Sequence, residues 1–281
     1  MKRFLLALAL MLCLSFCACA ETLEFMGMTF DSAATVIDFG DTAVTDIDGL
    51  RALIDQMPDL AQVDMYASVL STAEMDVLFD GYPQIFFGWT LNMKGHIVRT
   101  DATSFSTLHG RCPNHYTEDF YPLRYCRNLV ALDLGHNYID DISFLRNFPG
   151  MKVLILACNN IRDISVLAEL TELEYLELFS NKIKDFTPLL ALENLKDLNI
   201  SNNPVSDITP LFGMTQLERF WSGMNRSVRS QVKEMEKLLP ECEIFWDGEP
   251  TWGGWREHHR YDTIYAIFNE GVYRPFDEEG Q

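Results

Sequence analysis

The chain has 281 residues, of which 41 are acidic and 22 are basic, and its formal net charge is −19 at neutral pH. Such an acidic surface repels nucleic acid and anionic membranes, so we expect neither as a partner. The length is sufficient for one large domain or for a continuous array of repeats.

The first twenty residues predict a secretory signal peptide. Lys2 and Arg3 give a basic start, an apolar run continues to Cys19, and the small residues Ala18 and Ala20 fit cleavage after Ala20. Removal of this segment makes the net charge −21, because Lys2 and Arg3 are its only charged residues. We therefore expect the protein to be secreted or displayed at the cell surface.

Two other roles of this segment stay open. One is a lipid anchor on Cys19, for which the small Ala18 fits and the bulky Phe16 does not. The other is a transmembrane anchor, for which the apolar run is short against a hydrocarbon layer of ~30 Å. No second apolar stretch of spanning length follows, so we expect no membrane span in the mature chain.

Residues 21–118 predict an irregular N-terminal region that also caps the rest of the chain. Its composition and spacing favour strands at 36–39, 63–65 and 85–91 and helices at 48–56 and 72–79. A separate small α/β domain is the alternative. From Glu21 to Met93 there are thirteen acidic residues and one base, Arg51, which we attribute to solubility rather than to a site for a basic partner.

The pattern breaks between residues 94 and 120, where glycine, proline and polar residues predict a long excursion. His109, Cys112 and His115 have the spacing of metal ligands, and Cys126 could complete a tetrahedral zinc site. For an exported protein a Cys112–Cys126 disulfide is the simpler interpretation, and we expect no metal and no cofactor. Three pairings stay open among the four cysteines beyond the signal: Cys112, Cys126, Cys158 and Cys242.

Residues 119–228 carry the strongest signal, an apolar pattern that returns every 22 residues. Its central leucine recurs at Leu132, Leu154, Leu176 and Leu198. Five residues later an asparagine recurs at Asn137, Asn159, Asn181 and Asn203, and a weaker fifth copy runs through Phe220 to Asn225. This is the L-x-x-L-x-L-x-x-N-x-L pattern of leucine-rich repeats.

Each copy predicts one turn of an α/β solenoid. The L-x-L core is a short parallel strand with inward leucines, and the buried asparagine exchanges hydrogen bonds with backbone groups of its own and neighbouring turns. The return path starts at Asp141, Asp163, Asp185 and Asp207, where the Ser or Thr two residues later can cap a brief helical turn. So compact a repeat predicts a convex side made mostly of 3₁₀ turns.

The Asp-Ile-Ser/Thr-Pro-Leu return segment in a 22-residue frame resembles the internalin type of bacterial leucine-rich repeat. This resemblance implies extracellular display and protein recognition through the concave sheet. The helical cap, immunoglobulin-like segment and wall-anchoring tail that accompany internalin repeats are not readable in the chain. The resemblance therefore extends to the repeat type and not to a receptor or a role in invasion.

Residues 229–281 predict a C-terminal cap. A helix is expected at 230–239 and a last strand at 242–246, followed by a tail rich in aromatic residues: Trp252, Trp255, Tyr261, Tyr265, Phe268, Tyr273 and Phe276. Such a density fits a segment that closes the open hydrophobic end of a solenoid. The alternative is an aromatic platform for a glycan or the cell wall.

The outward side chains of the strands form the expected partner-binding surface. Reading across the last three turns, we predict contacts from Tyr175, Glu177, Phe179, Asp197, Asn199, Arg219 and Trp221. Tyr, Trp and Arg dominate interface hot spots because they bury much area and keep a polar handle. For Trp221, packing under the C-terminal cap is an equally open interpretation.

These observations predict an extracellular leucine-rich-repeat solenoid with a parallel concave sheet, irregular N-terminal repeats and an aromatic cap. We expect it to be a monomer that binds a protein or peptide ligand. No nucleophile elbow, phosphate loop, dinucleotide-binding glycine run or zinc-protease helix is present in the sequence, so we expect no enzyme. The alternative function is a structural protein that associates with the cell wall or a glycan through its aromatic tail.

Overall fold

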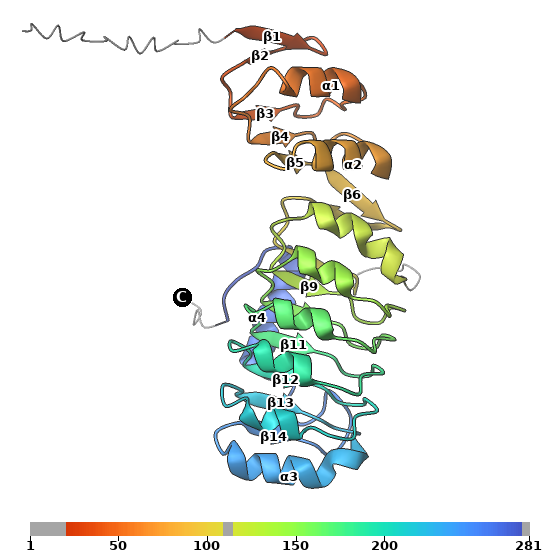
Figure 1. The fold of residues 1–281 in the computed structure, drawn as a ribbon, viewed down its shortest axis with the longest axis vertical. Helices are drawn as coiled ribbons and strands as arrows, with labels where there is room; N and C mark the ends of the chain where they lie inside the picture. The colour runs from red at the N-terminus through yellow and green to blue at the C-terminus, as the bar shows by residue number, and fades with distance from the viewer. Residues whose placement is uncertain (1–20, 109–114, 277–281) are drawn as a thin grey trace, which may run out of the picture.

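Stacked turns of chain form an elongated solenoid, which Figure 1 shows from its N-terminal hairpin at the top to helix α3 (Arg229–Leu238) at the bottom. The computed structural model describes residues 21–108 and 115–276. The predicted signal peptide and two of the predicted metal-site residues, His109 and Cys112, lie outside the described residues. In the described ranges no helix has the length and apolar character needed to cross a bilayer.

The N-terminal part consists of an antiparallel hairpin followed by a three-stranded parallel sheet backed by two helices. Ile37, Val63 and Phe87 stand opposite one another in that sheet, so the repeats here are 26 and then 24 residues long. The elements are β1 (Thr22–Phe25), β2 (Met28–Asp31), β3 (Val36–Asp38), α1 (Ile47–Ile54), β4 (Gln62–Asp64), α2 (Thr72–Gly81) and β5 (Phe86–Gly88). The predicted strands and helices of this region are confirmed, with boundaries shifted by a few residues.

Both N-terminal helices begin at side-chain caps that the sequence supplies. Asp46 accepts a hydrogen bond from the backbone N–H of Gly49 at 2.9 Å and so starts α1. Ser71 and Glu74 form a reciprocal capping box at the start of α2. These helices give the N-terminal repeats their extra length.

Residues 94–106 hold regular structure, although the sequence predicted a long excursion from residue 94 to 120. An antiparallel hairpin of β6 (Thr90–Met93) and β7 (His96–Arg99) leads into strand β8 (Ser104–Ser106). Strand β8 pairs in parallel with the first strand of the regular repeats and places Phe105 opposite Leu132. One apolar residue between two serines carries no leucine pattern, which is why this strand was missed.

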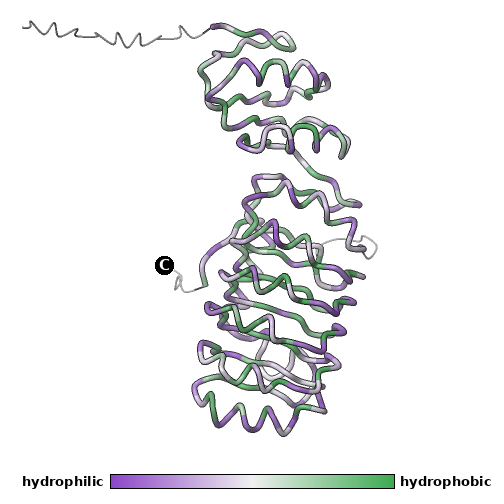
Figure 2. Tube along the Cα trace, in the orientation of Figure 1, coloured by the Kyte–Doolittle hydropathy of each residue, from purple (hydrophilic) through white to green (hydrophobic). Residues whose placement is uncertain are grey.

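The regular repeats and their flanks build one seven-stranded parallel sheet in the order β14 to β8. Its further strands are β9 (Ala131–Asp133), β10 (Val153–Ile155), β11 (Tyr175–Glu177), β12 (Asp197–Asn199), β13 (Arg219–Trp221) and β14 (Glu243–Phe245). Leu132, Leu154, Leu176 and Leu198 stand opposite one another on neighbouring strands. All four are fully buried, as the predicted stack of inward leucines requires. Apolar residues recur in turn after turn of the trace in Figure 2.

The convex side of these repeats is made of 3₁₀ turns, as predicted. They are η1 (Thr117–Tyr125), η2 (Ser143–Asn147), η3 (Ser165–Glu169), η4 (Thr187–Ala191) and η5 (Thr209–Gly213), with η6 (Arg226–Val228) leading into α3. The predicted capping residue was wrong. Asp163 accepts from the backbone N–H of Ser165 at 2.8 Å, and each repeat has the same contact, whereas the Ser or Thr side chain forms no cap. An aspartate two residues ahead reaches this N–H in the manner of an Asx turn.

The recurring asparagines form a buried ladder between turns. Asn181 accepts from the N–H of Ile161 at 3.1 Å and donates to the carbonyls of Leu156 at 2.9 Å and Leu178 at 3.0 Å. Asn159 and Asn203 make equivalent contacts. The prediction that the amide satisfies backbone groups of adjacent turns is therefore confirmed, and the ladder fixes the 22-residue register.

The residue before each ladder asparagine has a left-handed backbone. His136, Cys158, Ser180, Asn202 and Met224 all have φ between 52° and 64°. This conformation is uncommon for side chains with a Cβ and costs roughly 1–2 kcal/mol for each residue. The tight turn into the asparagine imposes it, and the buried hydrogen bonds that follow offset the strain.

The cysteines of the described ranges are free thiols. Cys126 is fully buried, with its sulfur 3.9 Å from the carbonyl oxygen of Arg99, and Cys158 and Cys242 are half-buried. A free thiol at Cys126 argues against the predicted pairing with Cys112, whose own position is outside the described residues.

The C-terminal region consists of an end cap and a segment that returns along the sheet. Helix α3 and strand β14 close the lower end of the solenoid, as the predicted cap requires. Residues 246–276, which we call the strap, then turn back along the sheet. Its helix α4 (His259–Glu270) lies against β8 and β9, far from the end of the stack, and is the dark blue helix at mid-height in Figure 1.

Candidate functional site

The candidate site is the concave face of β9 to β13, where the predicted partner-binding residues lie. Tyr175 stands opposite Asp197, which stands opposite Arg219, in one column of the sheet. Glu177, Asn199 and Trp221 form the next column. The strand register therefore brings these side chains together as predicted, and Phe179 belongs to the same buried cluster.

The expectation that this face is open is wrong. Phe179, the most exposed of the seven predicted residues, is 6% exposed, and the other six are at most 2% exposed. The strap covers them. It builds a second apolar core against the concave face, separate from the leucine core, to which it contributes Trp255, Ile264, Ile267 and Phe276. The C-terminal region therefore covers the concave face of the sheet as well as the lower end of the solenoid.

Trp255 is the aromatic anchor of the strap. Its ring lies 5.4 Å from that of Tyr175 and 5.1 Å from that of Trp221, and it is fully buried. The indole N–H of Trp221 donates to the carbonyl of Trp252 at 2.8 Å, and the amide of Asn199 donates to the carbonyl of Pro250 at 2.8 Å. The face thus holds the strap by ring contacts and by hydrogen bonds to its backbone.

Glu177 is a fully buried carboxylate held by the strap. It accepts from the Trp255 indole N–H at 2.9 Å and from the Arg256 guanidinium at 2.8 Å. The Tyr175 hydroxyl, two residues earlier on the same face of the strand, donates to the same carboxylate. A carboxylate taken out of water requires such a partner set, because an unpaired buried charge is strongly destabilising.

Asp197 is the second buried carboxylate, and Arg260 of the strap donates to it at 3.0 Å. Burial raises the pKa of Asp197 to about 6, against the opposing effects of Arg260 and Arg219. Arg219 lies 3.8 Å from Asp197 and donates to the Gly254 carbonyl at 3.0 Å. Two arginines from different parts of the chain therefore converge on one acid.

Asp133 is a buried acid on this face that we did not predict as a site residue. It accepts from the N–H of Gly135 at 3.0 Å and from Ser106, and burial raises its pKa to about 7. The nearby charge of Glu177 raises the pKa further, whereas the Gly135 hydrogen bond and Arg256 lower it. The sequence could have indicated this site residue, because Asp133 is a charged residue at an outward position of a strand whose other residues are apolar.

Several polar atoms on this face form no hydrogen bond although they are buried. They are Oδ2 of Asp197, Nε and Nη1 of Arg219, Nε of Arg260 and Oγ of Ser201. An unsatisfied buried polar group costs about 1–3 kcal/mol. The contact between strap and face is thus well packed in its apolar part and incompletely satisfied in its polar part.

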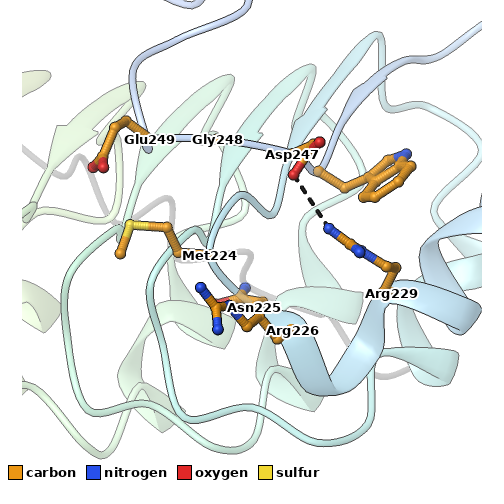
Figure 3. Close-up of a pocket in the computed structure, with 8 residues that line it drawn as sticks. Met224, Asn225, Arg226, Arg229, Asp247, Gly248 and Glu249 are labelled. Atoms are coloured by element: carbon orange, nitrogen blue, oxygen red, sulfur yellow. Dashed lines mark hydrogen bonds and ion pairs between the residues drawn. The ribbon is translucent and has the colours of Figure 1, made fainter.

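A hollow lies between the start of the strap and the lower end of the solenoid. Its volume is about 540 Å³, and its lining includes Met224, Arg226, Arg229, Trp246 and Glu249. Figure 3 shows the ion pair of 3.2 Å from Arg229 to Asp247 that borders it. Positive and negative side chains line it together, so its charge selects no single class of ligand.

His115, the described histidine of the predicted metal set, is buried against His96, with ring centroids 5.0 Å apart. Neither ring nitrogen of His115 has a hydrogen-bond partner. Burial lowers the pKa of both histidines, and for His115 the proximity of His96 lowers it further. Within residues 21–108 and 115–276, no three potential ligand side chains are grouped closely enough to hold a metal ion.

Two family profiles match the regular repeats. The leucine-rich-repeat profile matches residues 127–183, and the profile of two such copies matches residues 171–213. No curated protein sequence matches the chain.

Several solved structures are similar to this chain. Internalin C2 of Listeria monocytogenes has 22% identity and a TM-score of 0.38 over 75% of this chain and 80% of that chain. An internalin (inlF) of the same organism has 17% identity and a TM-score of 0.40 over 79% and 84%. A leucine-rich-repeat protein of Leptospira interrogans has 20% identity and a TM-score of 0.39 over 69% and 50%.

The assignment rests on the profile matches, on the in-register strands and on the asparagine ladder. Residues 127–213 are leucine-rich repeats, and their 22-residue turns build a leucine-rich-repeat solenoid.

Proposed function

We propose that this protein is an exported recognition module, secreted or held at the cell surface, that binds a protein or peptide on its concave face. The predicted signal peptide supports export, and the repeat type is one used for protein binding. The proposed contact residues are the seven of the concave columns. Tyr175, Phe179 and Trp221 supply apolar area, while Glu177, Asp197, Asn199 and Arg219 set specificity.

One observation carries this proposal: the face already holds a polypeptide. The strap presents Trp255 between two face aromatics, and it presents Arg256 and Arg260 to two buried carboxylates. Aromatic and arginine anchors at the centre of a desolvated contact are what hot spots of protein interfaces consist of. A surface that binds its own chain in this way has the composition and shape to bind another.

Proximity labelling at the surface of the producing cell tests this function. The protein is exported as a fusion to a labelling enzyme, and the enzyme exported alone is the control. We expect a small set of proteins to be enriched and the best of them to bind the purified chain. Substitutions Glu177→Gln and Asp197→Asn should weaken that binding about tenfold or more, because each removes a charged partner from the face.

A matched substitution on the convex side serves as the control. Leu190 lies in η4 and is 46% exposed, so Leu190→Lys should leave partner binding unchanged. Loss of binding with Leu190→Lys and full binding with the two face variants would contradict the concave site. Failure to enrich any protein over the control would contradict the function itself.

A glycan-binding function retains one supporting observation. Trp255 and Phe276 are buried in the second core, which removes them from any aromatic platform. Trp252 is 63% exposed and lies against Gly248, which lines the lower hollow together with Trp246. Co-sedimentation with cell-wall polysaccharide that Trp246→Ala and Trp252→Ala abolish would favour this alternative. We expect no such co-sedimentation.

A further inference from the structure

Residues 248–254, the part of the strap that precedes α4, contain three glycines with left-handed backbones, and we call this part the hinge. Gly248, Gly253 and Gly254 all have positive φ, at 108°, 74° and 95°. Within this stretch the backbone contact between the N–H of Trp252 and the carbonyl of Glu249 is a single turn rather than regular structure. In the closed state the face holds this stretch by hydrogen bonds to the carbonyls of Pro250, Trp252 and Gly254. Once those bonds break, the glycines give the chain access to many other conformations.

The strap also binds the face less completely than its burial suggests. Its guanidinium groups reach Glu177 and Asp197, yet Arg260 Nε and Asp197 Oδ2 form no hydrogen bond. The face residue Arg219 meets Asp197 through Nη1 at 3.8 Å and Glu243 through Nε at 3.5 Å, and neither contact is a hydrogen bond. Each of these groups could be better satisfied by a differently placed partner or by water after the strap leaves. In the leucine core beneath, the inward positions of β9 to β12 are leucines and isoleucine, whose side chains have no polar atoms to satisfy.

We propose that the strap occupies the ligand site as an intramolecular stand-in and leaves it as a unit when a partner segment of similar chemistry binds. The replacing segment belongs to another protein and presents a tryptophan followed directly by an arginine, with a second arginine four residues further on. This is the arrangement of Trp255, Arg256 and Arg260 in the strap. The inference rests on the proposed function, because it assumes that the concave face is the binding site.

The partner chemistry follows from the face. The slot between Tyr175 and Trp221 accepts a large aromatic ring, and the carboxylate of Glu177 accepts both an indole N–H and a guanidinium. Asp197 stands one strand away and takes the second guanidinium. Two buried carboxylates select cationic donors, and arginine fits because its planar group stays charged and donates in several directions.

A tethered strap competes with any free ligand. Its effective concentration at the face is high because the hinge keeps it close. A partner must therefore bind more tightly than the strap or add contacts elsewhere. The uncovered sheet of β3 to β5 provides room for such contacts, since Val36 is 49% exposed and Phe86 is half-buried. The strap therefore raises the affinity that a partner needs, and it does not prevent binding.

Hydrogen exchange on the unmodified chain tests whether the strap leaves as a unit. We expect the amides of α4 to exchange at least about 100-fold faster than those of β10 to β12, because opening of the strap exposes α4 while the repeats stay folded. Amides of α4 that exchange only together with those strands would overturn the proposal, because the strap would then be an inseparable part of the fold.

Peptide binding tests whether the vacated face takes a segment of the stated chemistry. The probe is a fluorescent peptide of residues 246–276, and the receptor is the full chain with Trp255→Ala, Arg256→Ala and Arg260→Ala, which weaken the strap in place. We expect this variant to bind the peptide at least about tenfold more tightly than the unmodified chain does. Adding Glu177→Gln should remove most of that gain.

The exposed tryptophan of the strap gives the matched control. Trp252 is 63% exposed, so Trp252→Ala should leave peptide affinity as in the unmodified chain. Equal peptide binding by the triple variant and the unmodified chain would overturn the proposal if the triple variant keeps a cooperative unfolding transition. If that variant does not fold, the exchange experiment on the unmodified chain decides. Labelled surface partners together with a strap that never opens would refute this inference alone and leave the proposed function standing.

Discussion

The two parallel sheets of the solenoid differ in what covers them. In β3 to β5 the outward side chains are exposed or half-buried, as at Val36, Asp38 and Phe86. In β9 to β13 every strand residue is buried on both faces of the sheet. The same strand geometry therefore gives an open surface in one region and a sealed one in the other. The accessible face of a repeat protein is decided by segments outside the repeats.

The two regions also stabilise their turns by different means. The N-terminal repeats use capped α-helices and unequal lengths, whereas the regular repeats use 3₁₀ turns, aspartate caps and the asparagine ladder. A regular ladder gives a flat column of side chains on which a segment of fixed spacing can lie. We attribute the binding of the strap to the regular spacing of these side chains. Each prediction below tests either the regular, covered repeats or the rest of the solenoid.

The largest expected effect is on closure of the covered face. Trp255→Ala should lower the free energy of strap opening by about 3–5 kcal/mol, because it empties a fully buried aromatic site. Hydrogen exchange of α4 measures this quantity. Trp252→Ala is the control and should change it by less than about 0.5 kcal/mol. Equal effects from the two tryptophans would show that the strap is not seated as described.

The ladder should rank second. Asn181→Ala should lower the free energy of unfolding by about 2–4 kcal/mol, since it leaves the N–H of Ile161 and the carbonyl of Leu156 without their partners. Urea unfolding checks this. Asn160→Ala, which removes only a contact with Lys182 near the surface, should cost about 0.5 kcal/mol or less. A small effect of Asn181→Ala would mean that other contacts fix the register.

The covered face and the β6–β7 hairpin should respond to acid in opposite directions. Asp133 and Asp197 have pKa values of about 7 and about 6 in the closed protein, above the ordinary 3.8, so closure holds protons that opening releases. Closure is therefore favoured as pH falls from 7 towards 4. His96 and His115 have pKa values lowered from 6.5 by burial, so unfolding takes up protons and the β6–β7 region loses stability below about pH 6.5.

Exchange rates corrected for intrinsic pH dependence would reveal these two slopes between pH 7 and 5. Protection of α4 should rise on acidification while protection of the β6–β7 hairpin falls. Asp133→Asn should flatten the first slope without touching the second. Parallel slopes in the two regions would contradict the assignment of these groups.

The smallest expected effect is on backbone strain in the repeats. Met224 is 47% exposed and has φ of 64°, so Met224→Gly should stabilise the protein by about 1 kcal/mol. A glycine placed in a helix should do the opposite. Leu238→Gly at the end of α3, where the side chain is 52% exposed, should destabilise by up to about 1 kcal/mol. Thermal unfolding of both variants compares the two, and destabilisation by Met224→Gly would contradict the strain.

The repeat architecture could be predicted from the sequence because its contacts are periodic. Each core leucine pairs with the leucine 22 residues away, and each asparagine bonds the backbone of the preceding turn, so the repeat pattern predicts both an element and its neighbour. Strand β8 was missed because Ser104 and Ser106 flank a single apolar residue. The aspartate cap was misassigned because Asp163 and Ser165 are both capping residues, and only the backbone geometry decides between them.

The covered face could not be predicted because its contacts follow no period. Glu177 meets Trp255 across 78 residues, and no pattern links the two positions. One signal was nevertheless present. Outward positions such as Val153, Ile155 and Tyr175 are more apolar than a water-facing sheet needs, which indicates a cover. The aromatic tail, with three arginines in a strongly acidic chain, was the segment suited to provide it.

Oxidative footprinting of the native chain with hydroxyl radicals tests the covered face most directly. Tyr175, Trp221 and Trp255 are fully buried, whereas Trp252 and Tyr265 are 63% and 56% exposed. We expect the first three to be oxidised much more slowly than the last two. Oxidation of Tyr175 and Trp221 at the rate of Trp252 would show that the strap does not lie on the concave face in solution.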